Sequence, residues 1–339
     1  MRIHVSGSGA VMLDNVVSCD GFINDYPIRV QTHVHDDHMY GFASSKGRQK
    51  ILMSEATRDL LIAEFNADIP YRSNFRSIPL NQTIPFENCE IRLLDSEHML
   101  GSVQVELTSA DGLKCGYSGD FAWPLANVIQ VEQLVLDSTY GSPDSKRRFS
   151  QEEANYRFRE LVVDRLRFGP VLIRAHRGTL QRAISCLDDA VRDPFIANSR
   201  IFEELQVYKR YGYSLTCILE ENTEEAQEAL CRRRYIRLYE TRDRFPSHTN
   251  DSTTIVLSAY LSRLNNPVME YSENSYCVAL SSHADYEETL EYVYATRARK
   301  VIADCSRGGH GIELANALRR ELGIKAEPSG NEIVREWGQ

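Results

Sequence analysis

Apolar and polar residues alternate in short segments along the first third of the chain, as they do in half-buried β-strands. Several of these segments end on a polar or metal-binding residue. One segment with helical spacing interrupts them, beginning at Ser54 and carrying apolar residues at Leu60, Leu61, Ile62 and Phe65. Strands separated by helices, with polar residues at the strand ends, predict a layered α/β fold whose site lies along one sheet edge.

The pattern changes near residue 143, where a charged turn leads into a long amphipathic helix. From there strand-like and helix-like segments follow one another, which predicts a parallel α/β insert. A strand that ends on a histidine then begins a final stretch of helix, strand and helix. We therefore expect a discontinuous first domain of residues 1–142 and 276–339, and an inserted second domain of residues 143–275.

Composition narrows the class of protein. With 42% hydrophobic and 26% charged residues, the 339-residue chain has the composition of a globular protein. No segment reaches the roughly 18–20 apolar residues of a membrane helix, and the N-terminus lacks the apolar region of a signal peptide. The eight scattered cysteines form no C-x-x-C pair. These features predict a cytoplasmic protein with reduced thiols and no membrane partner. The net charge of −9 argues against nucleic-acid binding over the whole surface, but not against a local basic groove.

The segment THVHDDH, residues 32–38, contains three of the nine histidines. In an extended segment His33 and His35 point the same way, and Asp37 and His38 can then turn toward a second point. Imidazole nitrogens combined with a carboxylate suit zinc. One such segment supplies about half of the ligands of two metal ions, so the others must come from strand ends elsewhere in the fold.

Two later segments offer the missing ligands. His98 ends an apolar strand in LLDSEHMLGS, and Asp120 follows a strand and a glycine in CGYSGDF. The order and spacing of these motifs resemble those of the metallo-β-lactamase fold superfamily. The resemblance implies that His98 completes the ligands of the first metal, that Asp120 bridges both metals, and that Asp20 in VSCDGF orients the histidine segment.

The segment LDSTYG, the long insert and the segment LSSHADYEETLEYV also resemble the β-CASP group of nucleases. This group includes the mRNA 3′-end-processing endonuclease, ribonuclease J and the DNA-repair nucleases related to Artemis. The resemblance covers nearly the whole chain. It implies an αββα metallo-β-lactamase sandwich with an inserted α/β β-CASP domain, with Asp137 as the acidic residue of motif A and His283 as the histidine of motif B.

One position departs from the pattern of the group. RNA-processing members usually have a histidine after the next strand, where KVIADCSRGGHG places Asp304, with His310 six residues later. The DNA-processing members also lack that histidine, which favours the DNA-repair branch. We favour Asp304 as the last ligand of the second metal. The alternatives are His310, or a weaker site formed by Asp37, His38 and Asp120 alone.

The resemblance implies a metallo-hydrolase that cleaves phosphodiester bonds of DNA or RNA. Two zinc ions, or manganese, would activate a hydroxide beside Asp37 and leave 5′-phosphate and 3′-hydroxyl ends. His283, oriented by Asp137, would protonate the leaving 3′ oxygen or hold a phosphate oxygen. The sequence leaves open DNA or RNA as substrate, exonuclease or endonuclease action, and the oligomeric state.

Arg232, Arg233 and Arg234 lie beside tyrosines in the insert, a composition that suits a track for phosphates and stacked bases. The alternative is a solvated surface on which these arginines pair with nearby glutamates. The loop SRGGHG, residues 306–311, fits either a phosphate-binding nest or a flexible loop.

Two other functions compete with the nuclease. One is a small-molecule hydrolase acting on thioesters or lactones with the same metal core, which would need neither the long insert nor His283. The other is a non-catalytic β-CASP scaffold subunit, which would not need an intact set of ligands. Both features are present, so the sequence favours the nuclease.

Overall fold

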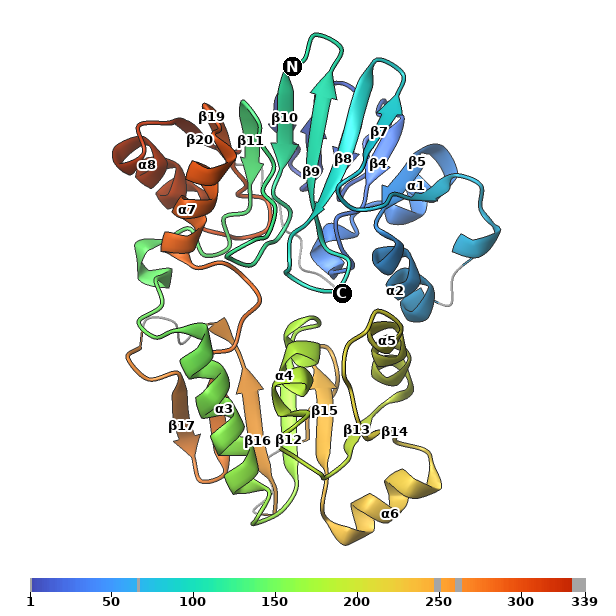
Figure 1. Cartoon of the computed structure of the whole chain (residues 1–339), viewed down its shortest axis with the longest axis vertical. Helices are drawn as coiled ribbons and strands as arrows, with labels where there is room; N and C mark the ends of the chain where they lie inside the picture. Colours follow the sequence, from blue (N-terminus) through green and yellow to red (C-terminus); the bar gives the residue numbers. More distant parts are fainter. Residues whose placement is uncertain (1, 66–67, 247–250, 260–263, 331–339) are drawn as a thin grey trace. The chain divides into compact units, whose positions relative to one another are not determined.

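The computed structural model describes residues 2–65, 68–246, 251–259 and 264–330. Contacts divide the chain into two compact units, whose helices and strands are labelled in Figure 1. Unit 1 consists of Met1–Ile62, Ala67–Lys146 and His283–Gln339, and unit 2 consists of Ala63–Asn66 and Arg147–Ser282. The second boundary follows residue 282 rather than residue 275, because strand β18 pairs with strand β16 in the sheet of unit 2.

Unit 1 contains two mixed β-sheets. The strands of the first, in spatial order, are β1 (Ile3–Val5), β2 (Val11–Leu13), β3 (Val17–Cys19), β4 (Ile28–Val30), β5 (Lys50–Met53) and β6 (Phe75–Ser77). Those of the second are β20 (Lys325–Pro328), β19 (Lys300–Ala303), β11 (Gln133–Leu136), β10 (Lys114–Tyr117), β9 (Val103–Ser109), β8 (Cys89–Asp95) and β7 (Thr83–Phe86). Each sheet joins a parallel part to an antiparallel part, so the expected α/β class with polar strand ends is confirmed at this level.

Strand β11 shows how alternation builds the layers of unit 1. Val135 belongs to the apolar cluster between the two sheets. Leu134 and Leu136 point to the other face, where they pack in a cluster with helices α7 (Tyr286–Thr296) and α8 (Gly311–Glu321). Because successive side chains of a strand point to opposite faces, one apolar strand is buried on both sides.

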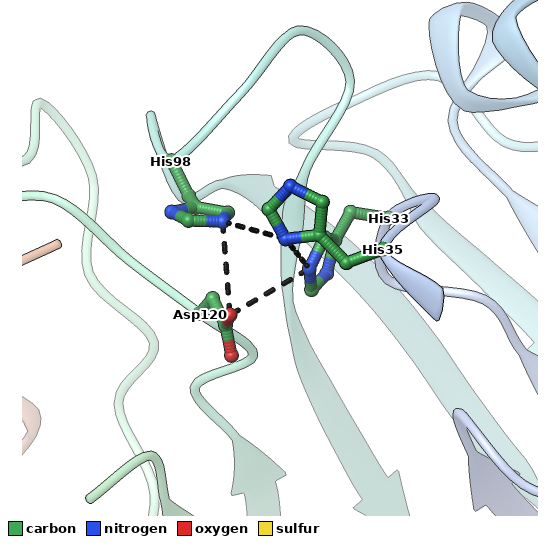
Figure 2. Close-up of side chains that lie close together, drawn as sticks. All are labelled: His33, His35, His98 and Asp120. Carbon is green, nitrogen blue, oxygen red and sulfur yellow. Dashed lines mark hydrogen bonds and ion pairs between the residues drawn. The ribbon is translucent and has the colours of Figure 1, made fainter. Parts of the chain in front are cut away.

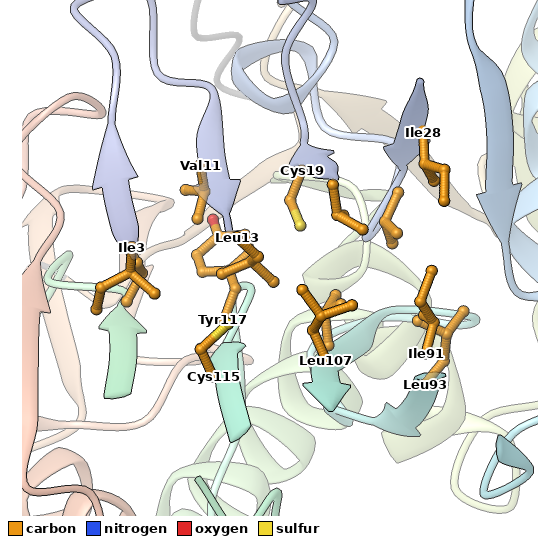
Figure 3. Close-up of a cluster of buried hydrophobic side chains, with 14 of the residues drawn as sticks. Ile3, Val11, Leu13, Cys19, Ile28, Ile91, Leu93, Leu107, Cys115 and Tyr117 are labelled. Atoms are coloured by element: carbon orange, nitrogen blue, oxygen red, sulfur yellow. The ribbon is translucent and has the colours of Figure 1, made fainter. Parts of the chain in front are cut away.

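Figure 3 shows the cluster between the two sheets of unit 1, with Ile28 of β4 and Leu107 of β9 both fully buried. On the first sheet, helix α1 (Phe42–Arg48) contacts β5, and helix α2 (Glu55–Phe65) follows that strand. The part of this unit that the structure describes also contains the short 3-10 helices η1 (Asp36–His38), η2 (Ile69–Tyr71) and η3 (Pro143–Ser145).

Unit 2 has the alternation of strands and helices that the sequence predicts for the insert. The strands in its described residues form one sheet. In spatial order they are β14 (Ile218–Glu220), β13 (Phe195–Ala197), β15 (Ile236–Glu240), β12 (Val171–Ala175), β16 (Thr253–Leu257), β18 (Ser275–Val278) and β17 (Val268–Ser272). All neighbouring strands are parallel except β17 and β18. The described residues of this unit also form the helices α3 (Gln151–Arg165), α4 (Thr179–Leu187), α5 (Ser199–Arg210) and α6 (Glu224–Arg232).

Candidate metal centre

The histidine segment follows strand β4 and turns through the 3-10 helix η1. His33 and His38 are buried, and His35 is partly exposed. The Nε2 atom of His33 lies 3.1 Å from the Nδ1 atom of His35, so these two imidazoles converge, as their alternate positions predict.

His98 and Asp120 follow strands β8 and β10, which both run antiparallel to β9 between them. Their carboxyl ends therefore lie at the same edge of the sheet. Gly119 adopts a left-handed φ of +57°, and a Cβ atom at that position would lie 2.7 Å from Val103 O. Only glycine fits this close turn, which carries the chain from β10 to the carboxylate of Asp120.

Figure 2 shows His33, His35, His98 and Asp120 around one point. The Nε2 atom of His98 lies 3.2 Å from His35 Nδ1, and Asp120 Oδ2 lies 3.6 Å from both His33 Nε2 and His98 Nε2. One ligand atom from each of the four residues lies within 4.8 Å of the others. Ligands about 2.1 Å from a tetrahedral ion are about 3.4 Å apart, so imidazoles and carboxylate at these separations fit a divalent cation.

Asp20 orients the imidazole of His38. Its Oδ2 atom accepts hydrogen bonds from His38 Nδ1 at 2.8 Å and from Thr32 Oγ1 at 2.5 Å, and its Oδ1 atom accepts from Thr32 N at 2.8 Å. The opposite nitrogen of His38, Nε2, lies 3.2 Å from Asp120 Oδ1, is buried, and makes no hydrogen bond. A buried imidazole nitrogen that faces two carboxylates is suited to ligate a divalent cation.

Thr32 extends this orienting effect to His33. Because its hydroxyl donates to Asp20, Thr32 Oγ1 acts as the acceptor from His33 Nδ1 at 3.0 Å. This arrangement places a proton on His33 Nδ1 and leaves the lone pair on Nε2, the atom that lies near His35 and Asp120. Asp20 thus contacts the imidazole of His38 directly and that of His33 through Thr32, and it favours a proton on the Nδ1 atom of each.

The two buried histidines, His33 and His38, have pKa values that are shifted in opposite directions. Burial lowers the pKa of His38, but the charges of Asp120, Asp37 and Asp20 outweigh this effect and raise that pKa to about 10. Burial, with a further contribution from His38, holds the pKa of His33 well below its usual value. Burial raises the pKa of Asp120, and the neighbouring His38 and His33 reverse this effect and hold that pKa well below its usual value. With this raised pKa, His38 would have to release a proton to ligate a metal ion.

His283 and Asp137 lie on the other side of Asp120. His283 Nε2 is 3.8 Å from Asp120 Oδ2, and His283 Nδ1 is 3.4 Å from Asp137 Oδ2. Thr139 donates to Asp137 from its backbone nitrogen at 2.9 Å and from its hydroxyl at 2.7 Å, which holds the carboxylate. Burial lowers the pKa of His283, while Asp137 and Asp120 raise it, and the net shift is upward.

Different environments surround the residues expected at the second metal, which are Asp37, Asp304 and the alternative His310. Among the described residues, a second group that could hold an ion consists of Asp20, His33 and His38, and neither this group nor the first includes Asp37 or Asp304. The Asp37 side chain is 58% exposed, and its Oδ2 lies 3.8 Å from His38 Nε2. Asp304 is buried and pairs with Arg307. His310 is exposed and lies 3.6 Å from Glu313 through its Nδ1 atom.

Arg29 forms hydrogen bonds that hold the backbone of the histidine segment, a role that the sequence pattern did not reveal. Its side chain is fully buried and donates to His38 O at 2.9 Å, Tyr40 O at 2.8 Å and Gln31 Oε1 at 3.0 Å. Gln31 in turn donates to His33 O at 2.7 Å and His38 O at 3.0 Å. A charged residue between the apolar residues of β4 was the available signal, since such a side chain needs several partners when buried.

The three arginines expected to contact substrate each pair with an acid. Arg232 pairs with Glu228 one turn earlier, as the alternative interpretation predicts; Arg233 lies 3.2 Å from the carboxylate of Asp251, and Arg234 lies 3.0 Å from that of Asp193. The three side chains are more than half exposed. Such exposed pairs contribute about 0–1 kcal/mol each, and a role in substrate binding stays a prediction.

No helix within the described part of the chain is long and apolar enough to cross a membrane.

Comparison with protein-family models finds no match. A 132-residue stretch, 38% of this chain, is 33% identical to 94% of a protein of Acidianus ambivalens described as an uncharacterized protein in lig 3′region. DNA ligase 6 of Arabidopsis thaliana is 29% identical over 147 residues, which are 40% of this chain and 10% of the ligase. A probable DNA ligase of Opitutus terrae is 23% identical over 321 residues, which are 91% of this chain and 29% of the ligase. The chain therefore spans less than a third of either ligase.

One solved structure, a protein of unknown function from Enterococcus faecalis V583, has a TM-score of 0.56 with this chain. The match covers 83% of this chain and 76% of that protein, at 11% sequence identity. At this identity the likeness shows a shared fold alone.

Proposed function

This chain belongs to the same family as the uncharacterized protein in lig 3′region of Acidianus ambivalens, and we propose that it is a metal-dependent nuclease of the metallo-β-lactamase superfamily with a β-CASP insert. One observation carries the proposal. His33, His38, His98 and His283 all present a ring nitrogen within 3.2–3.8 Å of the carboxylate of Asp120. Buried imidazoles gathered around one ionised carboxylate are typical of a metal centre and costly without one.

The architecture supports the same assignment. Unit 1 has two facing sheets with α1 against the first and α7 and α8 against the second, which is the order expected of an αββα sandwich. A parallel α/β unit is inserted between Lys146 and His283. The motif A and motif B residues, Asp137 and His283, flank this insert and lie together at the centre.

DNA is the substrate that we propose. Two relatives are named as DNA ligases, and this chain resembles one segment of each. The aspartate in place of a histidine at position 304 also favours the DNA-processing branch of the β-CASP group. Phosphodiester cleavage that leaves a 5′-phosphate and a 3′-hydroxyl is the chemistry this assignment implies.

In this proposal, some residues hold the metal ions and others transfer a proton. His33, His35, His98 and Asp120 hold one ion, and His38 faces a second position beside Asp120. A bound zinc or manganese ion supplies positive charge to the phosphate and lowers the pKa of a water molecule. Asp137 orients His283 and favours its charged form, so that the Nε2 atom holds a proton near the centre. His283 donates that proton to the leaving 3′ oxygen.

Incubation of the metal-loaded protein with end-labelled single- and double-stranded DNA and RNA tests the proposal. We expect cleavage of DNA that a chelator abolishes and that Asp120→Asn reduces about 100-fold or more, because the carboxylate lies beside His33, His38 and His98. Asp111→Asn, at an exposed turn, is the matched control. Cleavage by Asp120→Asn at the parent rate would mean that a contaminant cuts the substrate. Turnover of a thioester without any cleavage of nucleic acid would favour the small-molecule hydrolase instead.

A further inference from the structure

Asp304 lies directly after β19 but does not face the centre as a free carboxylate. Its Oδ1 atom accepts a hydrogen bond from Ser306 N at 2.8 Å, and its Oδ2 atom pairs with Arg307. The side chains of Asp304 and Arg307 are only 4% and 10% exposed. The pair is therefore largely shielded from water, and separating it would leave two buried charges without their partner.

Arg307 also contacts the histidine segment. Its Nε atom donates to Asp37 O at 3.3 Å, and its Nη2 atom donates to Gly9 O at 2.6 Å. One guanidinium group thus connects the end of β19 to the residue that precedes His38. Its positive charge is close enough to His38 to lower the pKa of that imidazole, against the acids that raise it.

We propose that Arg307 restricts this centre to one tightly bound divalent ion by withholding Asp304 from coordination and by placing a fixed positive charge beside the Asp37 and His38 side. The inference rests on the proposed metal centre and specifies its composition. His33, His35, His98 and Asp120 form the tight site. The second position keeps His38, Asp37 and the other oxygen of Asp120 and binds an ion weakly.

Two physical effects act together at the second position. A carboxylate that already accepts a charge-assisted bond from arginine has little basicity left for a cation, and the buried pair resists exchange. A guanidinium remains charged at any working pH, so it repels a second divalent ion continuously. A side chain that loses its proton within the working pH range would lose this repulsion, whereas the arginine at position 307 keeps its charge.

Zinc and manganese binding, measured by isothermal titration calorimetry and by metal content after dialysis, tests the inference without reference to activity. The parent should bind one equivalent at least 100-fold more tightly than a second. Asp304→Asn should keep that equivalent with its affinity changed less than threefold. Arg307→Met removes the charge, keeps an apolar side chain in its place and frees the buried Asp304, so the second equivalent should bind at least tenfold more tightly.

The double variant Arg307→Met/Asp304→Asn separates the two effects, because it removes the guanidinium without freeing a carboxylate. Its second equivalent should bind more tightly than in the parent but less tightly than in Arg307→Met. Arg320→Met, at an exposed arginine in the last turn of α8, is the control and should match the parent. Two equally tight equivalents in the parent, loss of the tight equivalent in Asp304→Asn, or no gain in a folded Arg307→Met would each overturn the inference.

Thermal unfolding establishes that each variant is folded. If Arg307→Met does not fold, the measurement on Asp304→Asn decides, because that variant keeps the guanidinium and replaces the carboxylate by a carboxamide of the same shape. A folded parent that binds no zinc at all would overturn the proposed function together with this inference. Two tight ions would overturn only the inference.

Discussion

Replacing Asp20 by asparagine exchanges a single oxygen for an amide nitrogen in a fully buried position. In the parent, both oxygens of Asp20 are acceptors, from Thr32 and from His38 Nδ1. In Asp20→Asn only one acceptor remains. The favoured orientation keeps the oxygen on Thr32 N and turns the amide toward His38, which then accepts through Nδ1 and carries its proton on Nε2.

The magnitude follows from the hydrogen bonds. A cation at His38 needs the lone pair of Nε2, which forces a proton onto Nδ1, where it meets the new amide donor. Rotating the amide would instead set it against the N–H of Thr32. Either arrangement leaves a buried donor unsatisfied at a cost of about 1–3 kcal/mol, and 1.4 kcal/mol corresponds to tenfold. We therefore expect the ion on the His38 side to bind about 10–100-fold more weakly, in line with the effect of other groups that orient ligands.

Calorimetric titration with zinc measures this loss, and nitrogen NMR of labelled histidine reports which ring nitrogen of His38 carries a proton. Nδ1 should be protonated in the parent and unprotonated in the variant. Asp25→Asn, at an exposed position, is the control. An unchanged second affinity, or an Nδ1 atom that stays protonated in Asp20→Asn, would refute the reasoning from tautomers.

Three further predictions concern the surroundings of the centre. Arg29→Met should lower the free energy of unfolding by about 2 kcal/mol in urea titrations, because the buried acceptors lose their donor. The loss is partly offset because the variant no longer buries a charge whose desolvation lowers the pKa of Arg29 to about 10. A loss no larger than that of the exposed control Arg48→Met would contradict this prediction. Affinity for the second ion should rise about tenfold per pH unit between pH 6 and pH 9. The reason is that His38, with its pKa of about 10, is protonated throughout this range and must release a proton when the ion binds. An affinity that does not change with pH in calorimetry would contradict this prediction. Gly309→Ala should lower stability by about 1–3 kcal/mol in thermal unfolding, because the new Cβ atom would lie 2.5 Å from the backbone of Ser138. Gly323→Ala is the control. Its Cβ atom would meet no neighbouring atom within 4 Å, so this variant tests the backbone effect of a left-handed glycine alone.

Sequence patterns predicted much of the candidate centre because metal ligands are confined to a few residue types at short, fixed spacings. The convergence of His33 and His35 follows from alternation along an extended segment. The positions of His98 and Asp120 at strand ends follow from apolar runs that stop before a polar residue and a glycine. The alternation of strands and helices likewise predicted the parallel sheet of the insert.

Other features depended on partners that are distant in sequence. Arg29 acquires its role only when the loop at residues 38–40 folds over β4. Arg233 and Arg234 pair with Asp251 and Asp193, acids 18 and 41 residues away in the sequence, rather than with the nearby glutamates. Charge pairing is a property of side-chain positions in space, so a local run of arginines cannot reveal whether its charge is available to a phosphate.

Taken alone, the order of residues determined which groups can ligate a metal ion and in which α/β class they are displayed. Tertiary structure alone decided which of those groups are free to do so, and Asp304 is the example. It has the right chemistry and stands at a strand end, but Arg307 folds back onto it and holds its charge. The physical reason is that a buried carboxylate stabilises whichever cation lies nearest, and only the packed fold determines whether that cation is an arginine or a metal.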